Sequence, residues 1–196
     1  MTVKLVGSSS GSVSLQAPAS TSGGANRVLT LPDINSTVDT TGRAGNILQV
    51  ISTTKTDTTS STSSSFADIS GMSVTITPSS SSNKIYLVGY VNTCTNDARN
   101  RVYLKMTGGN CSNYIGGAAT GHECANVSMV SADNYAYMLT SAPLIFLDSP
   151  STTSAITYQV QWAVEASQTA YLNRAYTLDS NAANTASTLT AMEVAA

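Results

Sequence analysis

Apolar and polar residues alternate with a period of two along most of this chain, and no other feature constrains its fold as strongly. The clearest segment is Tyr158–Val164, in which every second residue, beginning with Tyr158, is large and apolar. Met72–Ile76 and Val102–Met106 show the same alternation. A helix would scatter these apolar residues around its circumference, whereas a strand places them on one face. The pattern therefore predicts an all-β protein.

Two further runs, Ile85–Val91 and Leu144–Leu147, are apolar on both faces. Such strands are buried on both sides, either inside a sandwich or against a neighbouring subunit. Thr188–Val194 also carries apolar residues on both faces, which predicts a core strand although the chain ends two residues later. Turn residues at Gly108-Gly109 and Asp148–Pro150 separate strands at the spacing of an antiparallel β-sandwich or barrel.

The chain is expected to divide into an extended N-terminal arm, residues 1–45, and a β-sandwich head, residues 46–196. Three short extended pieces lie in the arm, at Val3–Val6, Ser12–Ala17 and Arg27–Leu31, between links rich in Ser and Gly. They contain too few large residues to build a core. Because exposed alternating strands need a partner, we expect the arm to bind another protein surface.

Charge is scarce in this sequence, at 10% of the residues with a net charge of −2, where about 25% is usual. Without a basic surface, binding to nucleic acid or to an anionic membrane surface is not expected. No apolar run approaches the roughly 18 residues of a spanning helix, so membrane insertion is not expected either. The N-terminal apolar stretch is too short for a secretory signal, which predicts synthesis in a cytoplasm.

The residues that usually carry chemistry are few and scattered. Cys94, Cys111 and Cys124 are odd in number and lack C-x-x-C spacing, so we expect free thiols without a disulfide framework. His122 is the single histidine; with Cys124 it could share one face of an extended segment, but a metal would need further ligands. No carboxylate pair has an interpretable spacing. We therefore expect no enzymatic activity, no catalytic residue, no cofactor and no metal.

Tyrosines in loops rich in Gly, Asn and Ser are the best candidates for a binding surface. Rigid amphipathic tyrosines among adaptable polar residues are typical of such surfaces, and sugar rings stack on their faces. The alternative is that they close one end of the sandwich with their hydroxyls in solvent. The candidates are Tyr114, Tyr135, Tyr137, Tyr171 and Tyr176.

Several segments resemble tail-fibre and related virion proteins of bacteriophages, particularly marine and cyanobacterial ones. Three resemble the linker that precedes the head in such proteins, and the others resemble the head itself. The linker segments are Gly11–Ser20, Val28–Asp33 and Gly45–Val50; the head segments are Phe66–Pro78, Asn83–Ile85, Tyr158–Trp162, Tyr171–Arg174 and Ser187–Val194.

This resemblance implies a homotrimeric β-sandwich of jelly-roll type, comparable to complement-like and tumour-necrosis-factor-like heads. It implies a protein made in the host cytoplasm and carried on the virion surface, with the arm attached to other virion proteins of the tail or capsid. The exposed loops would adsorb to a glycan or protein of the host cell surface. Two alternatives stay open: a capsid decoration protein or head fibre, and a glycan-degrading tail spike.

Overall fold

A computed structural model describes residues 2–6, 12–16, 43–97, 100–111, 126–129, 139–180, 182 and 184–196. The chain forms two units, Met1–Val38 and Asp39–Ala196. Within these described ranges, no helix has the length and apolar character needed to cross a membrane.

The first unit contains a hairpin of β1 (Thr2–Val6) and β2 (Ser12–Gln16). The two strands pair antiparallel, with Val3 opposite Leu15 and Leu5 opposite Val13. The apolar positions of one strand therefore oppose those of the other. Both strands coincide with extended pieces predicted from the sequence; the third predicted piece, Arg27–Leu31, lies outside the described residues.

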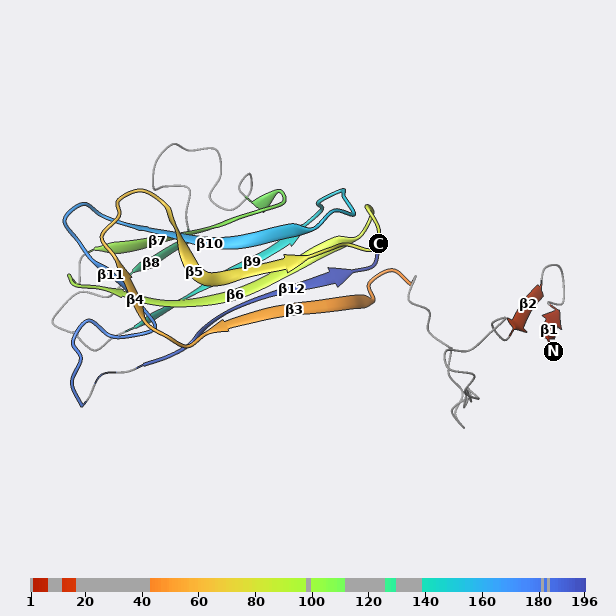
Figure 1. Ribbon diagram of the computed structural model, residues 1–196, viewed down its shortest axis with the longest axis horizontal. Coiled ribbons are helices and arrows are strands. Elements are labelled where there is room, and N and C mark those ends of the chain that lie inside the picture. The colour runs from red at the N-terminus through yellow and green to blue at the C-terminus, as the bar shows by residue number, and fades with distance from the viewer. Residues whose placement is uncertain are drawn as a thin grey trace. The chain divides into compact units, whose positions relative to one another are not determined.

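The second unit is an antiparallel β-sandwich, which confirms the predicted fold class (Figure 1). One sheet has the order β5-β10-β7-β8. In the other, β3, β12 and β6 are neighbours, β9 pairs with the free edge of β6, and β11 and β4 extend the sheet. The strands are β3 (Ile47–Lys55), β4 (Thr59–Ser61), β5 (Ala67–Ile76), β6 (Lys84–Thr95), β7 (Arg101–Thr107), β8 (Asn126–Met129), β9 (Thr140–Asp148), β10 (Ile156–Val164), β11 (Ala170–Leu172) and β12 (Ser187–Val194).

The strand order is that of a jelly roll. Without β4 and β11, the second unit has eight strands. Counted in chain order from β3, the first, eighth, third and sixth of them form one sheet, β3-β12-β6-β9. The facing sheet takes the second, seventh, fourth and fifth, β5-β10-β7-β8. The chain thus crosses between the sheets at every step except the one from β7 to β8. This double Greek-key path brings the first and last strands together.

The core lies between the two sheets and is filled by the alternating apolar residues that predicted the strands. Along β10, Tyr158, Val160 and Val164 are fully buried, and in β6 the same holds for Ile85 and Leu87. The C-terminal strand β12 pairs with β3 on one side and with β6 on the other, so the predicted core strand is confirmed in a central position.

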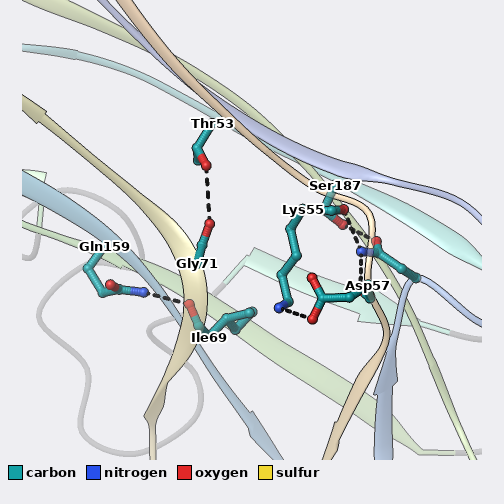
Figure 2. Close-up of polar contacts among 8 residues, drawn as sticks. Thr53, Lys55, Asp57, Ile69, Gly71, Gln159 and Ser187 are labelled. Carbon is teal, nitrogen blue, oxygen red and sulfur yellow. Dashed lines mark hydrogen bonds and ion pairs between the residues drawn. The ribbon is translucent and has the colours of Figure 1, made fainter.

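A bulge in β5 shapes the edge of the core at Gly71. Gln159 of β10 pairs with Ser73, but Gln161 pairs with Asp68, so β5 has extra residues between these two pairs. The backbone of Gly71 has a φ of 80°, in the left-handed region that favours glycine. The side-chain amide of Gln159 donates to the carbonyl of Ile69 at 3.0 Å and so satisfies backbone that the bulge leaves unpaired (Figure 2).

Candidate functional site

The outer faces of the two sheets differ sharply in polarity. On β5, β10 and β7 most outward positions are polar or charged: Gln161 donates to Asp68 at 2.7 Å, and the Lys105 ammonium lies 4.5 Å from the ring centre of Phe66. Arg101, at the start of β7, lies 4.0 Å from Glu165. A face of this kind is suited to contact with water.

The outward positions of β3, β12, β6 and β9 are largely apolar, and we call them the apolar face. Their register aligns Val50, Met192, Tyr86 and Leu147 in one row across all four strands. On these strands the outward positions carry a single charged residue, Lys84, at the end of β6. The apolar face consists of Ile47, Val50, Tyr86, Val88, Tyr90, Pro143, Ile145, Leu147, Met192 and Val194.

Side chains of the apolar face are exposed to an unusual degree for such residues. Ile47, Val50, Ile145 and Leu147 are each at least 50% exposed. Tyr86 and Tyr90, on the neighbouring strand β6, are 37% and 48% exposed, so the exposed apolar side chains adjoin one another across the sheet. The two-faced runs predicted from sequence thus have one side in the sandwich core and the other on this exposed face.

The chain enters the head beside its own C-terminus. The amide of Gly45 donates to the carbonyl of Ala195 at 2.8 Å, and the amide of Ala195 donates to Asn46 at 2.9 Å. β11 and β4 lie at the opposite end of the sheet (Figure 1). Along β6, the nine residue steps from Lys84 to Thr93 separate these two ends by about 30 Å.

Two of the predicted tyrosines come together at the end that carries β11. Tyr171 and Tyr176 have ring centres 5.8 Å apart, at an angle of 41°. The guanidinium of Arg174 lies over the Tyr171 ring, 4.2 Å from its centre. We call Tyr171, Arg174 and Tyr176 the aromatic cluster. The other predicted tyrosines, Tyr114, Tyr135 and Tyr137, lie outside the described residues.

Buried polar contacts fix the backbone next to the aromatic cluster. Asn173 is fully buried with a φ of 60°, and its side-chain amide donates to the carbonyl of Lys55 at 2.7 Å. The Ser187 hydroxyl donates to the side-chain oxygen of Asn173 at 2.6 Å (Figure 2). Lys55 itself forms an ion pair of 2.7 Å with Asp57 (Figure 2), and this contact lowers the pKa of Asp57.

The described cysteines are free and buried. Cys94 donates its thiol hydrogen to the carbonyl of Arg174, at an S···O distance of 3.2 Å. Burial raises the pKa of Cys94 to about 11 and, together with the nearby Asp148 carboxylate, that of Cys111 to about 12. Because the thiolate is the reactive form, both side chains act as packing groups near neutral pH. Cys124 and His122 lie outside the described residues.

No protein-family model matches this chain, and no curated protein matches it. Among solved structures, it is similar to infectious bursal disease virus Gx strain, at 18% identity and a TM-score of 0.35 over 97% of this chain and 46% of that chain. For the Gt strain the identity is 15% and the TM-score 0.38, over 98% of this chain and 46% of that chain. For a mutant VP2 protein of that virus, in derived particles, the identity is 13% and the TM-score 0.36, over 93% of this chain and 42% of that chain. These neighbours are viral capsid proteins. The chain spans less than half the length of each.

Arg174 was not among the binding residues predicted from the sequence. Its position over a tyrosine arises because the turn at Asn173 folds the chain back after β11, and one arginine in a loop gives no periodic signal. The sequence indicated the apolar face more clearly, because Ile85–Val91 has apolar residues on both faces of the strand. The sequence did not reveal which side of that strand would face solvent, because this depends on register with β12 and β9.

Proposed function

We propose that this chain is a non-enzymatic structural protein of a bacteriophage virion, in which three copies of the jelly-roll head assemble through the apolar face. The N-terminal arm, residues 1–45, joins the assembly to other virion proteins, and the far end of the head adsorbs to a host-cell surface. The apolar face is the observation that carries the proposal.

A contiguous exposed apolar face is typical of an interaction surface, because covering it with another apolar surface removes it from water. The second copy of the chain is the partner that best fits. The apolar face would form the centre of such an interface, with polar outward residues such as Thr190 and Ser52 at its rim. The charged outer face of the other sheet stays in contact with water in this arrangement.

We infer a trimer because the apolar face spans four strands and so offers two separate edges for contact. The apolar residues run from Val50 on β3 to Leu147 on β9, across four strands, so the face has two distinct edges. Around a three-fold axis, one edge of each copy packs on the other edge of the next copy, and the ring closes. The resemblance to trimeric fibre heads supports the same stoichiometry.

The positions of the two ends support the division of roles. The chain enters the head where Gly45 pairs with Ala195, so the arm leaves from that end. The aromatic cluster lies at the other end, about 30 Å away along β6. A head attached through the first end presents the second to its surroundings.

Light scattering of the purified full chain should give three times the chain mass of 20.2 kDa. Substituting Ile145→Lys should yield monomers, because it places a charge on the β9 edge of the apolar face, which the proposed assembly packs against the next copy. Thr75→Lys, an exposed position of β5 on the polar sheet, is the matched control and should leave the mass unchanged. A wild-type monomer, or an Ile145→Lys protein that still has the trimer mass, would refute the assembly.

Imaging of an intact particle tests the location. We expect the head as a density that projects from the particle, with its β11 end outermost, and an antibody against the head should block adsorption to host cells. Heads lying flat on the capsid shell would instead identify a decoration protein and refute the adsorption role.

A further inference from the structure

The aromatic cluster has the composition of a binding site for one class of saccharide. We propose that Tyr171, Arg174 and Tyr176 bind a sugar that carries a carboxylate, such as a uronic or sialic acid. The inference rests on the proposed function, because it names the chemistry of the host-surface ligand that the far end of the head would meet.

Arg174 is held in place before any ligand arrives. Its backbone pairs with Asn184 in an isolated β-bridge, and its carbonyl accepts the thiol hydrogen of Cys94. The preceding residue, Asn173, is fully buried in its own hydrogen bonds. The guanidinium lies over the Tyr171 ring, 4.2 Å from its centre. A cation held in this way loses little conformational freedom when it binds an anion.

The guanidinium of Arg174 has donors to spare. Lys55 and Arg101 each lie beside a carboxylate, Asp57 and Glu165. Within the described part of the chain, the contact of the Arg174 guanidinium is with the Tyr171 ring, and no carboxylate forms an ion pair with it. The guanidinium carries five N–H donors in one plane. That planar fork matches the two oxygens of a carboxylate.

Tyr176 supplies the second half of the site. Tyr176 is 44% exposed, its ring centre lies 5.8 Å from that of Tyr171, and Leu178 beyond it is 60% exposed. An exposed aromatic ring offers a flat apolar surface on which the C–H face of a pyranose stacks. A ligand that satisfies both Tyr176 and Arg174 has an apolar ring face and a carboxylate on the same small unit, which describes an acidic sugar.

Assembly would strengthen such a site. One stacking contact and one bidentate ion pair give weak binding, because few groups take part. Three copies in a trimer would engage a repeating acidic glycan at several points, so that avidity replaces affinity at each site. Weak single sites and strong attachment to a polymer are therefore compatible.

Binding of defined oligosaccharides to the full chain tests the inference by calorimetry. The probes are a galacturonic acid tetrasaccharide with its neutral methyl ester, and sialyllactose with lactose. We expect the wild type to bind at least one acidic probe. Its affinity for the neutral counterpart should be lower by a factor of about ten or more. Arg174→Gln and Tyr176→Ala should each weaken binding about tenfold, whereas the control Arg101→Gln should leave it unchanged.

Equal affinity for an acidic probe and its neutral counterpart would overturn the proposal, as would unchanged binding by Arg174→Gln. Failure of the wild type to bind either acidic probe would also overturn it. The mass of each protein, measured on the same samples, separates this result from the proposed assembly: absence of binding by a trimer refutes the sugar site alone, and a monomer mass refutes the assembly.

Discussion

Deletion of residues 188–196 should leave no soluble head, whereas deletion of the first ten residues should leave the head folded. β12 lies between β3 and β6, so its loss exposes the hydrogen-bonding edges of both neighbours. It also removes Leu189 and Ala191, which are fully buried in the core. Removing a central strand should consume the whole ~5–15 kcal/mol by which a domain of this size is stable.

Circular dichroism and size-exclusion chromatography of the two deletion proteins measure this outcome. The N-terminal deletion removes β1 and leaves every strand of the Asp39–Ala196 unit in place, so it serves as the control. We expect it to keep the β-sheet spectrum and the elution volume of a folded assembly. If the C-terminal deletion kept both properties, the central role of β12 would be wrong.

Most of the sandwich could be predicted because burial and strand periodicity coincide in this chain. Tyr158–Val164 has its large residues inside and its glutamines outside, as the alternation required, and β12 begins one residue before the predicted Thr188. β4 and β11 were not predicted. Each has three residues, too few to show a period, and exists because β11 continues the edge of β6 beyond β12.

The polar contacts inside the head could not be predicted from the sequence, for a different reason. Glu193 occupies an inward position of β12, where the pattern calls for an apolar residue, and its partners are 110 or more positions away in the sequence. Only the fold brings Gln49, Ser79 and Asn83 to one carboxylate. The same holds for Arg174, whose stack on Tyr171 depends on a turn rather than on a repeat.

Glu193 is the acidic residue whose replacement should most reduce the stability of the head. It is 1% exposed, and one carboxylate oxygen accepts hydrogen bonds from the Ser79 amide, the Ser79 hydroxyl and the Asn83 amide at 2.6–2.7 Å. The other oxygen accepts from Gln49 at 2.6 Å. These contacts join β12 to β3 and to the turn before β6. Glu193→Gln places an amide against the Gln49 donor and should cost about 2–3 kcal/mol of unfolding free energy at neutral pH.

The same carboxylate should make stability depend on pH in the acidic range. Burial alone would raise the pKa of Glu193, but the hydrogen bonds from Asn83, Gln49 and Ser79 outweigh it and lower the pKa from 4.5 to about 2. Because the folded state binds the proton less readily, the stabilisation is complete above pH 4.5 and is lost as the pH falls toward 2. A shift of this size corresponds to about 3 kcal/mol.

Urea unfolding at fixed protein concentration, repeated between pH 7 and pH 2.5, tests this dependence. The wild type should lose stability steeply below pH 4.5, and Glu193→Gln should show a flatter curve, so that the difference between the two proteins narrows as the pH falls. Asp68→Asn, which changes an exposed carboxylate on the polar sheet, should keep the wild-type slope. Parallel curves for the wild type and Glu193→Gln would show that the Glu193 carboxylate does not govern acid unfolding. A steep loss confined to proteins with Glu193 would place the acid-sensitive point of the head where β12, β3 and the turn before β6 are joined, beside the end at which the arm enters.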